Sequence, residues 1–105
     1  MEINELIEGI HQNAVNKGFW EDYENSPIGL SNVYVSQFLM LIVGEVAEAQ
    51  EGLRKNDYEN FKEELADIVI RTFDLAGGLD IDLEAEILAK MSKNKDRPRL
   101  HGKTF

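Results

Sequence analysis

The sequence predicts an all-α protein with a four-helix core, a central antiparallel helical hairpin and a basic C-terminal tail. Three observations support this prediction. Hydrophobic residues recur at spacings of three and four along most of the chain, as they do on one face of an α-helix. No segment alternates convincingly between hydrophobic and polar residues, as a half-buried strand would. Glycine, proline and capping residues divide the chain into four helical segments.

We expect a single domain spanning residues 1–105, because this length lies within the usual single-domain range. A core of this size is modest for a monomer, which favours assembly into an oligomeric bundle. The chain contains no cysteine, so disulfides, thiolate metal sites and zinc fingers are excluded.

The net charge of −9 disfavours binding to nucleic acid or to an anionic membrane, since both require a basic surface. No segment approaches the roughly 18 uninterrupted apolar residues of a membrane span. The acidic start, MEINELIEGI, is unlike a signal peptide. We therefore expect a cytoplasmic protein with no membrane partner.

The first predicted helix covers residues 3–16 and ends near Lys17-Gly18. Its hydrophobic face consists of Ile3, Leu6, Ile7, Ile10 and Ala14. The following segment, GFWEDYENSPIGL, mixes turn-forming residues with aromatic ones, which indicates a loop with hydrophobic anchors.

The second and third predicted helices form the hairpin. Ser31 is a candidate N-cap for the second helix, which runs to about Arg54. Asn56 and Glu59 resemble a capping box at the start of the third helix, and Gly77-Gly78 would stop it. The short turn between two long helices predicts antiparallel packing. The second helix has the hydrophobic stripe Val35, Phe38, Leu39, Ile42, Val46 and Ala49.

The fourth predicted helix is capped by Asp80 or Asp82 and continues to about Asn94, and Pro98 prevents its continuation. Its expected inner face consists of Leu83, Ile87, Leu88 and Met91.

Four carboxylates lie among the hydrophobic positions of the hairpin. Glu45 and Glu48 are three residues apart on the second helix, and Glu64 and Asp67 have the same spacing on the third. Each pair projects from one side of its helix, so a hairpin can bring all four together. Raised pKa values, basic neighbours or divalent cations would have to relieve their repulsion. Oxygen ligands without His or Cys suit Mg²⁺ first and Mn²⁺ second.

The alternative is that these four residues are solvent-facing helix surface, since Glu is a good helix former and 20 acidic residues produce such spacings by chance. Two pairs on consecutive helices favour the metal site. A di-iron centre is disfavoured, because neither His11 nor His101 follows a Glu in the Glu-x-x-His pattern of such centres.

The charge is unevenly distributed along the chain. Residues 1–89 contain 5 Lys and Arg against 19 Asp and Glu, whereas residues 90–105 contain 6 against 1. A basic end next to a cation site would suit a polyphosphate, since Arg and Lys both bind phosphate oxygens. A solvated or frayed charged terminus is the alternative. The donors are Lys90, Asn94, Arg97, Arg99, His101 and Lys103.

Phe19 and Trp20 in the aromatic loop could clamp a flat base by stacking, and the alternative is that they anchor the loop in the core. His11 lies beside the hydrophobic stripe of the first helix, where we expect a surface residue or one that supports a neighbouring site. No nucleophilic triad can be assigned.

Five stretches of the sequence, taken in order, form a recognisable set: GFW, LIVGEVAEAQEGLR, EELADIVIRTFDLAG, GLDIDLEAEI and KMSKNKDRPRLHGKTF. Together they resemble the MazG-like branch of the all-α nucleoside triphosphate pyrophosphohydrolases. The resemblance covers roughly residues 17–105, and the acidic pattern and the ending N-x-x-R-P-x-x-H-G-K are its most specific parts.

This resemblance implies an all-α fold in which Mg²⁺ supports cleavage between the α and β phosphates, giving a nucleoside monophosphate and pyrophosphate. It implies a homodimer or homotetramer with sites near subunit contacts. The metal ligands carried over by motif are Glu45, Glu48, Glu64 and Asp67, and Glu63 is either a further ligand or a surface residue. The expected substrate contacts are Trp20, Lys90, Asn94, Arg97 and Lys103, with Arg99 less closely matched.

Among the carboxylates, we expect Glu48 to act as the general base, since a base must reach the attacking water. The sequence therefore predicts a Mg²⁺-dependent nucleotide pyrophosphohydrolase that acts on an NTP or dNTP. The alternative is a non-catalytic helical module on the same fold, used for nucleotide sensing or for binding a protein partner.

Overall fold

The computed structural model describes residues 2–98, which form five α-helices and no strand. The all-α prediction is therefore confirmed for this part of the chain. The helices are α1 (Ile3–Asn16), α2 (Glu21–Glu24), α3 (Ser31–Arg54), α4 (Tyr58–Gly78) and α5 (Leu83–Lys95). The short α2 lies inside the segment that was predicted as a loop.

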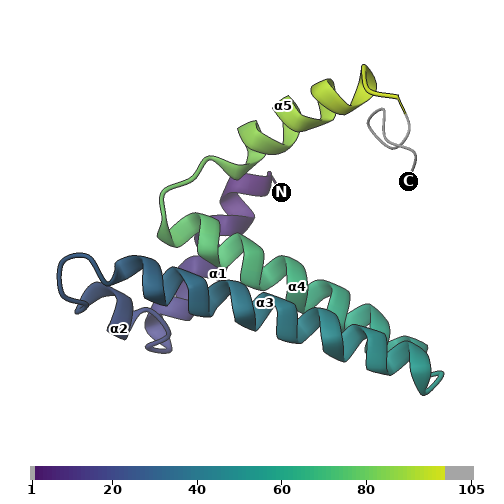
Figure 1. The fold of residues 1–105 in the computed structure, drawn as a ribbon, viewed down its shortest axis with the longest axis horizontal. Coiled ribbons are helices and arrows are strands. Elements are labelled where there is room, and N and C mark those ends of the chain that lie inside the picture. Colours follow the sequence, from purple (N-terminus) through teal and green to yellow (C-terminus); the bar gives the residue numbers. More distant parts are fainter. Residues whose placement is uncertain (1, 99–105) are drawn as a thin grey trace.

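The α3–α4 hairpin is the largest unit of the fold. The two helices run antiparallel along most of their length, as predicted from the short turn between them (Figure 1). Helix α1 packs on α4, and α2 packs on the first half of α3. None of the helices among the described residues is long and apolar enough to cross a membrane.

Helix α5 does not complete a four-helix core in the single chain. It leaves the end of α4 at an angle and projects away from the hairpin, with its main helix contact at α1 (Figure 1). Two of its expected inner residues, Leu88 and Met91, are 60% and 59% exposed. The body of the described chain is therefore the hairpin covered by α1 and α2.

The start of α3 differs from the prediction. Ser31 is the first helical residue, and Leu30 occupies the N-cap position without a side-chain hydrogen bond. The hydrogen bond of the Val33 amide to the Leu30 carbonyl closes a tight first turn instead. Backbone bonding therefore replaces the predicted serine cap.

The turn between α3 and α4 also differs in detail. Asn56 adopts a left-handed conformation, with φ of 57°, which Asn tolerates better than most residues. Asp57 is the true N-cap, since its Oδ1 accepts a hydrogen bond of 3.1 Å from the Asn60 amide. Of the two residues predicted as the cap of α5, Asp80 and Asp82, the structure uses Asp82, which accepts from the Ala85 amide at 3.1 Å.

Gly77 and Gly78 are the last two residues of α4, so the helix ends at the predicted pair. A Cβ on Gly78 would approach the Trp20 ring to 2.1 Å, and one on Gly77 would approach the His11 Cβ to 2.8 Å. These glycines therefore permit α1 and the segment after it to pack closely on α4. Leu79 follows α4 as its C-cap residue.

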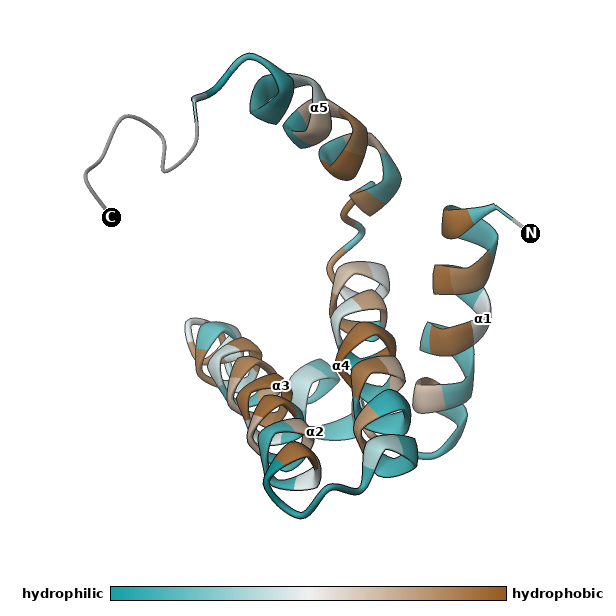
Figure 2. Cartoon of the chain, turned by 90° about the vertical axis from the view of Figure 1, so that its right-hand side faces the viewer, coloured by the Kyte–Doolittle hydropathy of each residue, from teal (hydrophilic) through white to brown (hydrophobic). Residues whose placement is uncertain are grey.

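The core of the described chain is small. Its buried hydrophobic residues are Ile7, Ala14, Trp20, Ala49 and Ala76. Part of the hydrophobic stripe predicted for α3 is instead exposed, including Leu39 and Val46. Figure 2 shows hydrophobic segments along α3 and α4 that α1 does not cover.

Candidate metal centre

Three carboxylates converge where α3 and α4 face each other. Glu45 and Glu48 on α3 and Glu64 on α4 each offer an oxygen atom, and these atoms lie within 4.8 Å of one another. The first two are one helical turn apart on the same side of α3. The antiparallel packing of α4 places Glu64 against them. The structure thus brings together three of the four carboxylates proposed as metal ligands.

Glu45 is neutralised by a basic neighbour from α4. The Arg71 Nε donates a hydrogen bond of 2.9 Å to the Glu45 Oε1. This bond, helped by a hydrogen bond from Glu64, lowers the pKa of Glu45 below its ordinary value. Glu45 therefore stays ionised more readily than an ordinary glutamate.

The pKa of Glu64 is raised, whereas that of Glu45 is lowered. Its hydrogen bond to Glu45, its partial burial and the negative charge of Glu48 raise its pKa to about 7. The protonated Glu64 carboxyl donates to Glu45, so that the two groups share a proton near neutral pH. The Glu64 Oε2 is buried and has no hydrogen-bond partner among the described residues.

These observations fit a hard divalent cation. The cluster offers only carboxylate oxygens, which suit Mg²⁺ or Mn²⁺. A cation would replace the proton held between Glu45 and Glu64 and would satisfy the unpartnered Glu64 oxygen. The residues placed to hold it are Glu45, Glu48 and Glu64.

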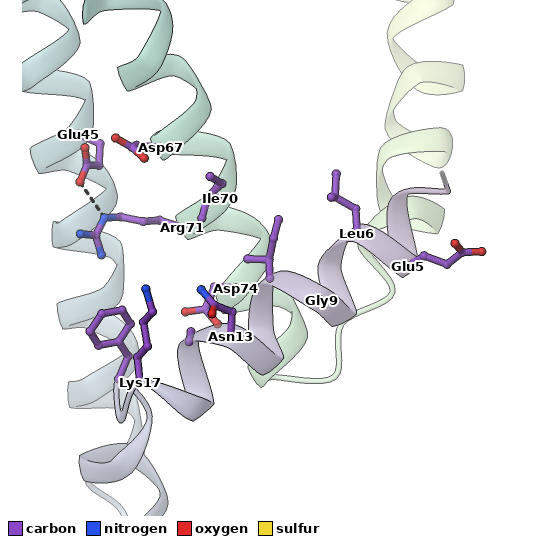
Figure 3. Close-up of a pocket in the computed structure, with 13 residues that line it drawn as sticks. Glu5, Leu6, Gly9, Asn13, Lys17, Glu45, Asp67, Ile70, Arg71 and Asp74 are labelled. Atoms are coloured by element: carbon purple, nitrogen blue, oxygen red, sulfur yellow. Dashed lines mark hydrogen bonds and ion pairs between the residues drawn. The ribbon is translucent and has the colours of Figure 1, made fainter.

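Asp67 lies next to this cluster but not within the group of three. It is one turn after Glu64 on α4, and it lines a pocket together with Glu45 and Arg71 (Figure 3). Glu63 is exposed, in agreement with its alternative as a surface residue.

A pocket of about 540 Å³ opens beside the carboxylates, between α1, α4 and the middle of α3. Its volume lies in the range of small-molecule sites. Lys17 and Arg71 give it cationic groups, and Asn13 adds an amide that can donate and accept hydrogen bonds (Figure 3). The exposed ring of Phe19 also lines it.

Trp20 is not available to clamp a base in this structure. Its side chain is 2% exposed and packs against Phe38, with ring centroids 4.5 Å apart. The Trp20 Nε1 donates a hydrogen bond of 2.8 Å to the Asp74 Oδ1, which His11 Nδ1 also contacts at 2.8 Å. The structure therefore supports the alternative, in which Trp20 anchors the loop in the core, and His11 supports this anchor.

The basic residues of α5 that are expected to contact phosphate lie away from the carboxylates in the folded chain. Lys90 and Asn94 lie on α5 and Arg97 follows it, and every residue from Leu88 to Pro98 is exposed. In the single chain, the acidic and basic parts of the expected site are thus separated (Figure 1). Arg99, His101 and Lys103 lie outside the described residues.

Sequence reasoning missed two residues that matter at this site, Arg71 and Asp74. Both continue the spacing that identified Glu64 and Asp67, since positions 64, 67, 71 and 74 recur at three, four and three. This spacing places them on one side of α4. Following the same spacing of three and four residues for two more turns of the helix would therefore have identified both.

Comparison with known families supports this interpretation. The model that describes the MazG-like family matches residues 30–104, which include α3, α4 and α5. The match thus begins after the GFW motif and covers the carboxylates and the basic end. A search of curated proteins found no match, and a search of solved structures found none either.

Proposed function

The chain belongs to the MazG-like family, and from this membership we propose that it hydrolyses nucleoside triphosphates between the α and β phosphates. The substrate is an NTP or dNTP, the products are a nucleoside monophosphate and pyrophosphate, and the cofactor is Mg²⁺, with Mn²⁺ as a substitute. The observation that carries the proposal is the convergence of Glu45, Glu48 and Glu64 within 4.8 Å.

The three carboxylates and Asp67 are the proposed metal ligands, with Asp67 contributing from the adjacent wall of the pocket. When bound, Mg²⁺ neutralises charge on the triphosphate and makes water a better nucleophile. Glu45 contributes a carboxylate that Arg71 keeps ionised, and Glu64 contributes one that must first lose its proton.

Glu48 is the proposed general base, because it is the exposed member of the cluster and water can reach it. It accepts a proton from the attacking water as the water oxygen bonds to phosphorus. The anhydride bond between the α and β phosphates breaks, and pyrophosphate leaves with the electron pair of that bond.

The pocket beside the cluster is the proposed position of the nucleoside. Its volume, its cationic Lys17 and the exposed ring of Phe19 suit a base and sugar next to a phosphate chain. The triphosphate would extend from this pocket toward the carboxylates. Lys90, Asn94, Arg97 and Lys103 are the proposed phosphate contacts from the basic end of the chain.

The experiment that tests this function is incubation of the purified protein with a panel of NTPs and dNTPs in the presence of Mg²⁺, followed by a pyrophosphate assay. We expect at least one nucleotide to yield pyrophosphate and a monophosphate in equal amounts. A folded protein that yields no pyrophosphate from any nucleotide would instead favour the non-catalytic module.

Two variants connect the activity to the site. Glu48→Gln and Asp67→Asn keep the shape of each side chain and remove its charge, so both should abolish turnover and preserve helicity by circular dichroism. Glu59→Gln, on the exposed first turn of α4, is the matched control and should retain activity. Full turnover in both site variants would remove the metal assignment.

A further inference from the structure

Arg71 uses only part of its hydrogen-bonding capacity in its contact with Glu45. Its Nε donates the bond of 2.9 Å to the Glu45 Oε1, and no hydrogen bond links its two terminal nitrogens to the described residues. The Arg71 side chain is 40% exposed, although the Glu45 side chain beside it is largely buried. The unbonded side of the guanidinium therefore faces the pocket that opens next to the carboxylate cluster (Figure 3).

Lys17 brings a second cationic group to the same pocket. It is the C-cap residue of α1, and Gly18 follows it with φ of 85°, so the chain turns toward α2 at this point. No carboxylate among the described residues forms an ion pair with the Lys17 ammonium group. The side chain extends from the end of α1 toward the guanidinium of Arg71 (Figure 3). Two cations that share a pocket repel each other unless an anion lies between them.

The carboxylates that line the pocket have other partners or other positions. The Asp74 Oδ1 accepts a hydrogen bond from the Trp20 Nε1 and contacts the His11 Nδ1, both at 2.8 Å. Glu5 lies at the opposite end of the pocket, near the start of α1 (Figure 3). The other two carboxylates of the lining belong to the proposed metal site. The two cations are thus placed to bind an anion from outside the chain.

The chemistry of this pocket suits a phosphate that is attached to a less polar group. Arginine presents its N–H groups as a planar fork and lysine presents a compact charge, and both bind phosphate oxygens. Most of the remaining wall is hydrophobic, with one amide that can donate and accept hydrogen bonds. These residues are Leu6, Ile10, Ile70, Phe19 and Asn13. A nucleoside with one phosphate matches this combination.

Glu45 connects the two cations to the carboxylate cluster. It is a member of the cluster and also holds the Arg71 guanidinium. When Glu45 binds a divalent cation, its charge holds the guanidinium less strongly, because the two positive groups repel each other. The pair of Glu45 and Arg71 is therefore weakened under the conditions in which a nucleotide would bind.

We propose that Lys17 and Arg71 form a phosphate subsite on the same chain as the carboxylate cluster, and that Arg71 leaves Glu45 for the phosphate when a cation binds there. The subsite takes the phosphate attached to the nucleoside, and the nucleoside lies against the hydrophobic wall of the pocket. That the ligand is a nucleotide rests on the function proposed above. The basic residues of α5 are not needed to hold this part of the ligand.

The test is equilibrium binding of nucleoside monophosphates, which the proposed reaction cannot cleave. Ribose and deoxyribose monophosphates of the common bases are titrated calorimetrically into the wild-type protein, once in Mn²⁺ and once in EDTA. We expect at least one monophosphate to bind in Mn²⁺ and to bind roughly tenfold more weakly in EDTA, because Arg71 then stays with Glu45. The nucleoside without its phosphate should show no such dependence on the metal.

Variants then separate the subsite from the metal site. Lys17→Met and Arg71→Met should each weaken binding of that monophosphate in Mn²⁺ by roughly tenfold, since each removes a charged hydrogen-bond donor. Arg71→Met should leave the affinity for Mn²⁺ itself unchanged or higher, because a positive charge next to the cluster is lost. Arg54→Met is the matched control, since Arg54 is 74% exposed at the end of α3, and it should change neither affinity.

A purely structural role for Arg71, limited to holding Glu45 in place, predicts the opposite pattern. Arg71→Met would then weaken binding of Mn²⁺, and this result would overturn the inference. Equal monophosphate affinity in the wild type and both subsite variants would overturn it as well, as would a folded wild-type protein that binds no monophosphate in Mn²⁺.

These measurements do not depend on pyrophosphate release. A protein that binds monophosphates through Lys17 and Arg71 and hydrolyses no nucleotide would support the subsite and reject the proposed function. A protein that releases pyrophosphate, and whose subsite variants bind monophosphates as the wild type does, would support the function and reject the subsite.

Discussion

The Arg71 Nε donates a hydrogen bond of 2.9 Å to the Glu45 Oε1, so a guanidinium from α4 neutralises a carboxylate that a cation would also bind. The Glu45 side chain is only 13% exposed. Arg71 therefore supplies part of the countercharge that the cluster needs in the absence of metal.

Replacing Arg71 should destabilise the metal-free protein, because Glu45 would lose its countercharge. In EDTA, Arg71→Met should lower the free energy of unfolding by about 1–2 kcal/mol, because a charged hydrogen bond to a largely buried carboxylate is lost. Mg²⁺ should raise the melting temperature of this variant more than that of the wild type, since the cation replaces the missing charge. Urea and thermal unfolding with and without Mg²⁺ measure both effects.

Lys62→Met is the matched control for this experiment, because Lys62 pairs with Glu59 at 2.9 Å on the exposed surface of α4. Surface ion pairs contribute little, so its free energy of unfolding should change by less than about 0.5 kcal/mol. Equal losses in the two variants would contradict a special role for Arg71.

Glu64 should make the stability of the metal-free protein depend on pH. Its pKa rises from an ordinary value of 4.5 to about 7 in the folded state, so the folded protein keeps a proton that the unfolded chain has lost. The free energy of unfolding should therefore fall as the pH rises from 4.5 to about 7 and should be insensitive to this group above that range. The lowered pKa of Glu45 acts below pH 4.5, outside this window.

Urea unfolding in EDTA at several pH values checks this dependence, with Glu64→Gln as the comparison. The variant should lose the part of the slope that belongs to Glu64. Because Mg²⁺ competes with the Glu64 proton, the wild-type affinity for Mg²⁺ should also rise by up to about tenfold per pH unit below pH 7. Parallel curves for the two proteins would show that Glu64 does not titrate in this range.

Gly78 should be required for the packing of Trp20. In Gly78→Ala, the new Cβ would approach the ring to 2.1 Å, so the ring or the helix must shift. We expect a loss of about 1–3 kcal/mol in the free energy of unfolding, which is typical of overpacking.

Gly9→Ala is the control for Gly78→Ala, since a Cβ at Gly9 meets nothing within 4 Å and the residue lies inside α1. It should be neutral or stabilising by up to about 1 kcal/mol, as expected for alanine in a helix. The contact between Trp20 and α4 would be in doubt if both variants behaved alike in urea unfolding.

Variants of the neighbouring aromatic residues Phe19 and Trp20 should distinguish a role in substrate binding from a role in core packing. Trp20→Ala removes a buried ring and its hydrogen bond to Asp74, so we expect a loss of about 3–5 kcal/mol in the free energy of unfolding. Phe19 is 62% exposed and lines the pocket, so Phe19→Ala should change stability little and raise KM. A destabilised Phe19→Ala protein with unchanged KM would contradict this division of roles.

The hairpin and its carboxylates could be predicted from the sequence because both depend on local spacing. Glu45 and Glu48 had to share one side of α3, and the short turn after Arg54 had to bring α4 back along it. The partner of Glu45 was harder to predict. Arg71 is 26 residues away along the chain, and its contact depends on the register of the two helices.

The position of α5 could not be predicted, because a hydrophobic spacing identifies a face but not what covers it. Leu88 and Met91 have the spacing of core residues and are exposed in the single chain. Trp20 illustrates the same limit, since an aromatic residue in a loop suits either a ligand or the core. Gly78 on a distant helix decides between them by providing space for the ring.

The most direct test of the carboxylate cluster is a calorimetric titration of Mn²⁺ into the metal-free protein at pH 7.5, comparing the wild type with Glu48→Gln and with the surface control Glu59→Gln. Binding that weakens at least tenfold in Glu48→Gln and is unchanged in Glu59→Gln is the predicted result. Equal Mn²⁺ affinity in all three proteins would contradict a cation site formed by α3 and α4.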